Sequence, residues 1–313
     1  MANSKWYNLI QDRKIYQLMK IAISILNYNG LDNTLDCLNS IKRLKKDNIS
    51  LDVIVSDNNS QDNSTHTLAK LKDILFIPNE KNYGFAEGHN RAIKTAIKRR
   101  ASAILILNND TIVDENLLQS LMKTSRKSDI ISPKIYFAPN YEFHKSRYKK
   151  NDLGKVIWYA GGIIDWDNIL GKHIGVDEID EGQYNERLAI DFATGAAMFV
   201  KREVFEKIGL FDERYFLYLE DMDFCVRAKK AGFKIMYEPK AIVWHKNAQS
   251  AQGSGSRFQE YYITRNRLLF ALKFAKFKTK LAVLKHTLFH LNNPIRRKAL
   301  LDFVTYRFEE CKF

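Results

Sequence analysis

Cysteine, proline and glycine are all scarce in this sequence, and their scarcity excludes several classes of protein. Only three of the 313 residues are cysteines (Cys37, Cys225 and Cys311), far apart and without a CxxC pair. An odd, scattered set argues against a disulfide framework or a zinc site and fits a reducing compartment. Five prolines and 14 glycines leave no low-complexity linker. With 45% hydrophobic and 27% charged residues, the composition is that of a folded globular protein.

Long apolar runs are missing as well. Nowhere do about 18 apolar residues follow one another, so we expect no transmembrane helix. The first 20 residues contain no uninterrupted apolar core of the kind found in signal peptides, and we assign residues 1–20 to an N-terminal extension. These two absences together lead us to expect a cytoplasmic protein.

Basic residues outnumber acidic ones. The formal net charge is +14, which calls for an anionic partner such as nucleic acid, an acidic membrane surface or a phosphorylated substrate. Between Tyr261 and Phe313 there are 12 lysines and arginines against three acids, so most of the excess lies at the C-terminal end. No nucleic-acid recognition motif accompanies these basic residues, and we therefore expect no nucleic-acid partner.

Apolar, strand-like segments alternate with helix-like segments in the first third of the sequence. The strand-like segments are IAISILN, LDVIVSD, ILFIP and ASAILILN, and segments with helical spacing lie between them. This alternation predicts an α/β fold with a mostly parallel, Rossmann-like sheet that is flanked by helices. We expect this domain to cover residues 21–255.

Polar residues stand where three of these strands end. They are Asn27 with Tyr28, Asp57 with Asn58, and Asn108 with Asn109 and Asp110. Ligands of such sheets bind beyond the carboxyl ends of the strands, so the three tips predict one binding rim. Asparagine and aspartate also follow strands because they form good turns, and the sequence alone leaves that alternative open.

The stretch from Asp191 to His245 contains the main candidates for chemistry. Glu220 and Asp221 interrupt an apolar and aromatic run, where we expect the first turn of a helix. The unpaired N–H groups of a helix start favour carboxylates, and the flanking aromatic residues would raise a carboxylate pKa toward that of a general base. The alternative is a capped helix whose acids are solvated.

The C-terminal part predicts a basic amphipathic helix. Seven apolar residues between Phe270 and Leu291 follow alternating four- and three-residue steps, and several lysines lie off that stripe. Such a helix can lie on an anionic bilayer, or it can pack on the main domain with its lysines outward. We assign residues 256–313 to a helical region that is a candidate for membrane association.

Taken in order, the motifs resemble those of the family 2 glycosyltransferases, which have the GT-A fold, and within them a rhamnosyltransferase-like branch. The resemblance extends from about Ile21 to about Phe270. Its specific parts are the ED-containing block and the ordered series of strand-end motifs. The matching segments are ISILNYNG, VIVSDNNSQDNS, NEKNYGFAEGHNRAI, ILILNNDTIV, ATGAAMFVKREVFEKIGLFDERYFLYLEDMDFCVRAKKAGFK and YYITRNRLLF.

This resemblance implies a role for individual residues. Asp221, with Glu220 beside it, is similar to the general base. Asp110 resembles the acid that holds Mg²⁺ or Mn²⁺ on the donor diphosphate, and His245 the histidine that completes this site in some members. The residues that resemble nucleotide or donor contacts are Asn27, Tyr28, Asp57, Asn58, Asn82, Gly84, Asn90, Asn108, Asn109, Thr194 and Gly195.

One departure from the family pattern affects the metal. Where many relatives have acids, this sequence has Asn108 and Asn109, which leaves Asp110 as the only carboxylate. We therefore expect weaker metal binding, or help from His245. A buried, hydrogen-bonded core histidine is the alternative reading of His245.

The resemblance implies transfer of a sugar, with inversion, from a nucleotide-diphosphate donor to an acceptor hydroxyl. The expected setting is cell-surface polysaccharide or lipid-linked glycan synthesis, with dTDP-rhamnose or a UDP-sugar as donor and a glycan or lipid-linked acceptor. We expect the protein at the inner face of a membrane, as a peripheral protein. The alternative is an inactive sugar-nucleotide- or glycan-binding module on the same fold. The sequence predicts neither the linkage nor the oligomeric state.

Overall fold

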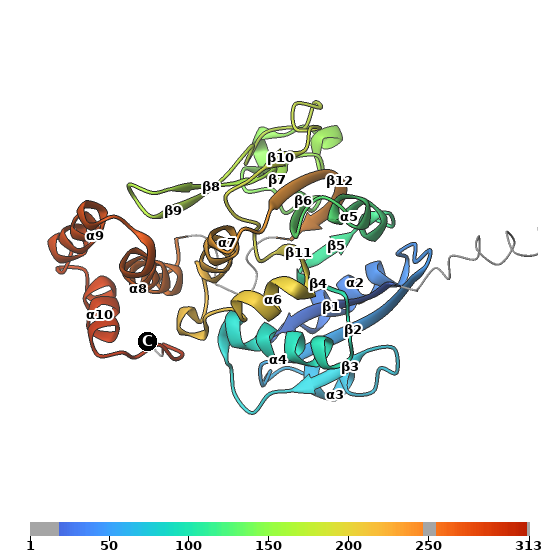
Figure 1. Ribbon diagram of the computed structural model, residues 1–313, viewed down its shortest axis with the longest axis horizontal. Coiled ribbons are helices and arrows are strands. Elements are labelled where there is room, and N and C mark those ends of the chain that lie inside the picture. The colour runs from blue at the N-terminus through green and yellow to red at the C-terminus, as the bar shows by residue number, and fades with distance from the viewer. Residues whose placement is uncertain (1–18, 247–254, 312–313) are drawn as a thin grey trace, which may run out of the picture.

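The protein is described by a computed structural model that covers residues 19–246 and 255–311. Within these ranges a ten-stranded sheet forms the centre of the molecule. Eight of its strands follow the order β10-β12-β6-β11-β4-β1-β2-β3, while β5 pairs with β12 and β7 pairs with β6. Helices flank the sheet, and α8, α9 and α10 gather at one end of the molecule (Figure 1). Of the predicted N-terminal extension, residues 1–18 lie outside the described part, and Met19 and Lys20 open the first strand.

The first four strands are parallel, as predicted. Strand β1 pairs with both β2 and β4, and β2 pairs with β3. In this register Asn27 lies opposite Asp57, and Leu26 lies opposite Asn108. The predicted strand tips therefore meet at one edge of the sheet. The elements are β1 (Met19–Asn27), α2 (Leu31–Lys42), β2 (Ile49–Asp57), α3 (Ser64–Leu68), β3 (Leu75–Pro78), α4 (Gly84–Lys98) and β4 (Ala103–Asn108).

The second half of the sheet is mixed. Strand β11 (Ala197–Lys201) runs antiparallel between β4 and β6 (Ile130–Phe137), and β12 (Ile235–His245) runs parallel to β6. The end of β12 also pairs with the short β5 (Thr111–Val113), so that His245 lies opposite Thr111. This pairing brings His245 next to the tip of β4. The other elements here are α5 (Leu117–Ser125), β7 (Ile157–Tyr159), β10 (Leu188–Ala189), α6 (Arg202–Ile208) and α7 (Glu220–Lys230).

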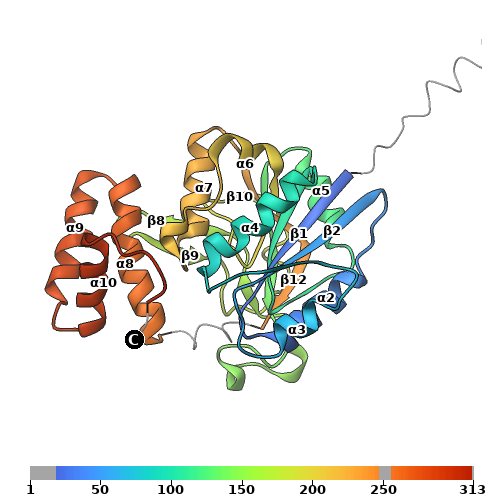
Figure 2. The ribbon, with the colours of Figure 1, turned by 90° about the horizontal axis from the view of Figure 1, so that it is seen from below.

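An irregular insertion between β6 and β11 forms a hairpin, β8 (Gly162–Asp165) with β9 (Leu170–His173). The hairpin extends toward α8 (Figures 1 and 2). The guanidinium of Arg267 donates to the carbonyl of Asn168 at 2.6 Å, and the rings of Trp166 and Phe270 have their centroids 5.9 Å apart. The insertion thus connects the sheet to the C-terminal helices.

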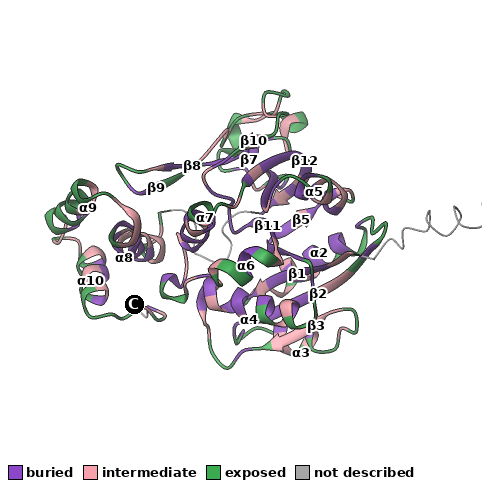
Figure 3. Ribbon diagram, in the orientation of Figure 1, coloured by how far each residue is buried: buried purple, intermediate pink, exposed green. Residues whose placement is uncertain are grey.

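The predicted helical C-terminal region is confirmed, but its amphipathic helix is not continuous. The chain forms α8 (Arg257–Phe274), α9 (Phe277–Phe289) and α10 (Pro294–Val304). Ala275 and Lys276 are extended, with ψ near 155°, although neither residue is a glycine or a proline. The break divides the predicted apolar stripe. Phe270 is buried in the same core as the sheet, whereas Phe277 is 73% exposed. The outward sides of α9 and α10 are exposed at the far end of the molecule (Figure 3).

Candidate active site

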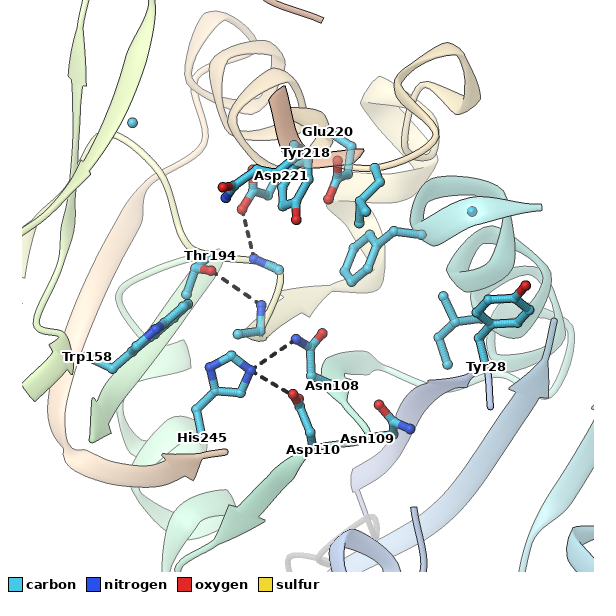
Figure 4. A pocket seen from close by; sticks show the side chains of 18 of the residues that line it. Tyr28, Asn108, Asn109, Asp110, Trp158, Thr194, Tyr218, Glu220, Asp221 and His245 are labelled. Atoms are coloured by element: carbon cyan, nitrogen blue, oxygen red, sulfur yellow. Dashed lines mark hydrogen bonds and ion pairs between the residues drawn. The ribbon is translucent and has the colours of Figure 1, made fainter. Parts of the chain in front are cut away.

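A cavity of about 800 Å³ opens beyond the carboxyl ends of β1 and β4. The start of α7 and the end of β12 also contribute to its wall, and Phe143, Trp158 and His173 from the insertion close another side. The predicted site residues that line it are Tyr28, Asn58, Asn82, Gly84, Asn108, Asn109, Asp110, Thr194, Gly195, Glu220, Asp221 and His245. The structure therefore brings together side chains that are more than 200 residues apart in sequence (Figure 4).

Asp110 and His245 form a buried pair in this cavity. His245 Nε2 lies 3.0 Å from Asp110 Oδ1 and 3.4 Å from Asn108 Nδ2, and the rings of His245 and Trp158 meet edge to face at 4.6 Å (Figure 4). Burial acts to raise the pKa of Asp110, but the neighbouring His245 outweighs it and holds that pKa below its usual value. The other ring nitrogen of His245, Nδ1, has no hydrogen-bond partner among the described residues.

This pair can serve a divalent cation only in part. A carboxylate oxygen and an imidazole nitrogen at 3.0 Å can both face one ion. No group of three histidine, cysteine or acidic side chains gathers anywhere in the described ranges 19–246 and 255–311. Since Mg²⁺ commonly takes the rest of its ligands from phosphate oxygens and water, the donor set fits a cation that binds together with a phosphorylated ligand.

The cavity is acidic, although the whole chain carries a charge of +14. No lysine or arginine belongs to its described lining. A polyphosphate placed here would find no lysine or arginine in that lining to neutralise it. The lining acids are Asp110, Asp177, Glu220, Asp221 and Glu310.

Glu220 and Asp221 begin α7, as predicted, and both line the cavity. The backbone N–H of Gly195 donates to Asp221 Oδ2 at 3.0 Å, and that of Met222 donates to Oδ1 at 2.7 Å. Glu220 is 4% exposed, and its Oε2 has no partner in the described part of the chain. Burial raises the pKa of both carboxyls, and the charge of Asp221 raises that of Glu220 further. The pair thus favours one proton on Glu220 and an ionised Asp221.

The loop that leads into these acids has an unusual backbone. Three of its non-glycine residues have positive φ: Phe216 at 58°, Tyr218 at 71° and Leu219 at 70°. Each such residue costs of order 1–3 kcal/mol unless its surroundings hold it. Tyr218 lies beside the two acids in the cavity (Figure 4), and burial followed by the charge of Glu220 raises the pKa of its hydroxyl to about 12. The hydroxyl is therefore a neutral hydrogen-bonding group.

Asn27 and Asp57 lie beneath the cavity rather than in its lining. Both side chains are fully buried, and Asn27 Nδ2 donates to Asp57 Oδ1 at 2.6 Å. Asp57 also accepts from Ser60 and Thr65, and Asn27 accepts from Thr34. The nucleotide contact expected of these two residues stays a prediction, and in this structure their polar atoms bond other side chains and the backbone. They hold the loop after β2 in place.

The side chains of Asn58 and Asn82 do line the cavity, and they bond each other at 3.0 Å. Asn82 also donates to Glu310 Oε1 at 2.8 Å, which brings the C-terminal segment to this loop. Asn90, by contrast, lies outside the lining. Its amide bonds both the N–H and the carbonyl of Phe211, so it helps to pack α4 against the segment before α7, and its nucleotide contact stays a prediction.

Tyr218 is one of the aromatic residues that the sequence placed beside the acids, and Trp158 belongs to the irregular insertion, a candidate wall of the site. Other lining residues were not predicted from the sequence, among them His173, Phe258, Gln259 and Glu310. Burial lowers the pKa of His173 to about 4, so this ring is neutral near pH 7. No motif marks Glu310, which reaches the cavity only through the folding of the C-terminal segment.

Comparison with known proteins gives consistent matches. Residues 19–270 match the family described as "Glycosyltransferase like family 2". A low-salt glycan biosynthesis hexosyltransferase, Agl10 of Haloferax volcanii, is 24% identical over 261 residues, which cover 82% of this chain and 77% of the relative. The dTDP-rhamnosyl transferase RfbF of Shigella flexneri is 25% identical over 262 residues, covering 80% and 79%.

Among solved structures, GalNAc-T7 with UDP, GalNAc and Mn²⁺ aligns with a TM-score of 0.59 at 14% identity. The alignment covers 80% of this chain and half of that one. At this identity the likeness concerns the fold alone. It agrees with a central mixed sheet that is flanked by helices.

Proposed function

Because this chain belongs to glycosyltransferase family 2 and has the GT-A fold, we propose that it is an inverting enzyme that moves a sugar from a nucleotide-diphosphate donor directly to an acceptor hydroxyl. One observation carries this proposal: a single cavity contains both the acid pair at the start of α7 and the Asp110–His245 pair. Single displacement requires one group for the hydroxyl proton and one site for the leaving diphosphate, and the two pairs supply them.

Asp221 is proposed as the general base. Two backbone N–H groups favour its ionised form, and the apolar surroundings keep its pKa above that of an ordinary aspartate. As the acceptor oxygen attacks the anomeric carbon, its proton passes to the Asp221 carboxylate and the bond to the donor diphosphate breaks. A positioned carboxylate of this kind contributes about 10²–10⁴-fold to the rate.

Asp110 and His245 are proposed as the protein ligands of Mg²⁺ or Mn²⁺. A divalent cation bound there would stabilise the negative charge that grows on the leaving diphosphate. The support is local: the part of the cavity lining that the structure describes has no lysine or arginine, and Asp110 and His245 face each other at 3.0 Å. Asn108 and Asn109 line the same floor without adding charge.

The donor class can be identified by thermal unfolding with a panel of nucleoside diphosphates and sugar nucleotides, each with and without Mn²⁺. A ligand at 100 times its dissociation constant stabilises the fold by about 2.7 kcal/mol. We expect a shift with one nucleotide that Mn²⁺ enlarges. dTDP-rhamnose and UDP-sugars are the first donors to test, because a relative of similar length is a dTDP-rhamnosyl transferase. If no nucleotide shifts the midpoint, the proposal is wrong.

Binding without turnover is the outcome expected for an inactive sugar-nucleotide-binding module. The two asparagines before Asp110 favour that second candidate, and the retained acid pair at Glu220 and Asp221 favours the enzyme. Release of nucleoside diphosphate in the presence of a glycan or lipid-linked acceptor separates the two.

We also propose that the far side of α9 docks on an anionic membrane surface, where a lipid-linked glycan acceptor would be found. Phe277, Leu281, Leu284 and Leu288 share one side of α9 and are 39–73% exposed. Residues 276–301 contain seven lysines and arginines and no acid. This charge complements anionic lipid and would repel a second copy of the same surface. In the described ranges no helix is long and apolar enough to span a bilayer.

Flotation with phosphatidylglycerol-containing vesicles, compared with pure phosphatidylcholine vesicles, tests this surface. We expect binding to the anionic vesicles that weakens with salt. Concentration-dependent dimers without vesicle binding would instead assign the same surface to a second copy of the chain.

A further inference from the structure

The motif YYITRNRLLF has no role in the site described so far, yet its residues Arg265 and Asn266 are fully buried. They lie in α8 and face the loop that precedes Glu220. That loop contains Phe216, Tyr218 and Leu219 in the left-handed region, which only glycine adopts readily. A backbone of this kind persists only where its surroundings determine it.

Asn266 makes the densest set of contacts with this loop. Its Nδ2 lies 2.8 Å from the carbonyl oxygen of Tyr215, 2.7 Å from that of Leu217 and 2.8 Å from that of Tyr218. The two N–H bonds of one side-chain amide are therefore shared among three carbonyls within four consecutive residues. Asn266 is absent from the cavity lining, so it can act on a substrate only through the loop.

Arg265 fixes the orientation of this amide. Its Nε donates to Asn266 Oδ1 at 3.1 Å, which directs the Nδ2 group of Asn266 to the loop. Its Nη2 donates to the carbonyls of Arg214 and Tyr215 at 3.1 and 3.0 Å, and its Nη1 to those of Arg307 and Glu309. The guanidinium also lies over the ring of Tyr262, 4.9 Å from its centroid.

The other side of the loop is held by the start of α4. The N–H of Phe85 donates to the carbonyl of Phe216 at 2.6 Å, and the Phe216 ring stacks on Tyr262 with a centroid distance of 5.1 Å. Gly84 leaves room for this contact, because a Cβ there would lie 2.5 Å from the Phe216 carbonyl oxygen. The loop is thus fixed between the loop–helix motif at Gly84 and the motif in α8.

We propose that Asn266, oriented by Arg265, is the positioning residue that holds the left-handed loop 216–219 and thereby places Tyr218, Glu220 and Asp221 in the cavity. The proposal rests on the proposed transferase function. It makes α8 part of the catalytic unit, rather than an attachment that only binds a membrane.

The test compares Asn266→Ala with Asn293→Ala in the full chain. The side chain of Asn293 caps the start of α10 and donates to Glu260, so its loss weakens the C-terminal helices, while its described hydrogen bonds reach neither the loop nor Asn266. We expect Asn266→Ala to lower kcat by about 10²-fold, the effect of misplacing a catalytic group by about 1 Å. Donor KM and the Mn²⁺-dependent thermal shift should stay near those of the wild type. Asn293→Ala should keep the wild-type kcat.

Equal kcat values for the two variants would overturn the proposal, and so would a loss of donor affinity with kcat unchanged. Should Asn266→Ala not accumulate as folded protein, Asn266→Ser, which retains one hydroxyl donor, carries the same comparison with a smaller expected loss. Adding Leu219→Gly to Asn266→Ala should recover part of kcat, because glycine adopts the left-handed conformation without help. If Asn266 only stabilised the fold, adding Leu219→Gly would not recover kcat.

Amide hydrogen exchange gives a readout that needs no substrate. In Asn266→Ala the peptide covering residues 212–222 should exchange faster than in the wild type, and in Asn293→Ala it should not. A wild-type protein that transfers no sugar from any donor would refute the proposed function, while the exchange comparison would still decide whether Asn266 holds the loop. Unchanged exchange in Asn266→Ala overturns the inference.

Discussion

Two rims of the cavity hold their polar groups in opposite ways. On the rim at the ends of the parallel strands, side-chain amides pair with one another, as in Asn58 with Asn82, and the buried pair of Asn27 and Asp57 lies beneath them. On the rim at the start of α7, Glu220 keeps an oxygen without a partner among the described residues, and the carboxyl pKa values are raised. Hydrogen bonds pair the polar groups of the first rim, which suits it to binding. The second rim holds two neighbouring buried carboxyls that cannot easily both be ionised, which suits it to proton transfer.

The difference teaches where each kind of variant should act. Changes in the paired rim should alter affinity for the nucleotide and leave the chemical step intact. Changes in the acid rim should alter the chemical step and leave affinity intact. The experiments below test this division, beginning with the largest expected effect.

Asp221→Asn should lower kcat by about 10²–10⁴-fold, because the amide cannot accept the acceptor proton. The thermal shift produced by donor and Mn²⁺ should remain. Asp191→Asn, which removes an outer carboxylate that pairs with Lys229, serves as the control and should transfer normally. A fully active Asp221→Asn enzyme would show that another residue is the base, and it would refute the division of roles between the two rims.

Removal of divalent cations with a chelator should lower transfer by about 10²–10³-fold, because charge on the leaving diphosphate would lose its stabilisation. The nucleotide-induced thermal shift should weaken in parallel, since the described cavity lining holds no lysine or arginine. Readdition of Mn²⁺ should restore both quantities in the wild type and much less in Asp110→Asn. Transfer that survives thorough chelation would refute the roles proposed for Asp110 and His245.

Asn82→Ala should weaken nucleotide binding by about tenfold and leave kcat nearly unchanged. The substitution breaks the bonds that Asn82 makes with Asn58 and Glu310, each worth about 1 kcal/mol. Titration of the thermal shift against nucleotide concentration measures the effect, with the remote amide variant Asn116→Ala as control. A loss confined to kcat would show that the paired rim takes part in chemistry.

Glu220→Gln should retain most of kcat near neutral pH, because glutamine mimics the protonated carboxyl that burial favours. In both proteins kcat should fall as the pH drops through the raised pKa of Asp221, since the base must be ionised. The free energy of unfolding should change with pH in the opposite direction. A raised pKa in the folded state stabilises the wild type at low pH, and this stabilisation is lost as the pH rises through that pKa.

As the pH rises, the melting temperature of the wild type should therefore decline, and that of Glu220→Gln should decline less. If Glu220→Gln instead abolishes transfer at every pH, the roles of the two acids must be exchanged.

Leu284→Ser should weaken flotation with anionic vesicles several-fold, because full burial of one leucine is worth about 1.5–3 kcal/mol and an interface buries it only in part. Ile163→Ser, on the hairpin strand β8 and outside α9, removes a comparably exposed apolar side chain and should bind vesicles normally. Transfer to a soluble acceptor should be the same in both variants, because neither side chain lines the cavity.

The parallel half of the sheet and the position of the acids could be predicted from local patterns. The apolar run before Asn27 and the one before Asn108 indicated strands, and ligands of such sheets bind at their ends. The sequence also indicated that Glu220 begins a helix, because polar acids there interrupt an apolar run. These features depend on a few neighbouring residues and are therefore visible in one sequence.

The remainder depends on contacts between distant segments. No residue type marks the break at Ala275 and Lys276, so the apolar stripe looked continuous. The resemblance assigned Asn90 to the nucleotide loop, and only the structure shows that its amide also binds the backbone of Phe211, 121 residues away. The left-handed loop was invisible for a similar reason, since its backbone is determined by α8 and α4 rather than by its own residues.

The place of Asn266 in the sequence also determines when this loop can form. On the ribosome the strands of the sheet and the loop at residues 216–219 are synthesised before α8, and domains fold largely as they emerge. A nascent chain could therefore close its sheet, and with it the paired rim, while the acids still lack the amide that positions them. Sugar transfer would then begin only once synthesis has passed residue 266 and α8 has docked.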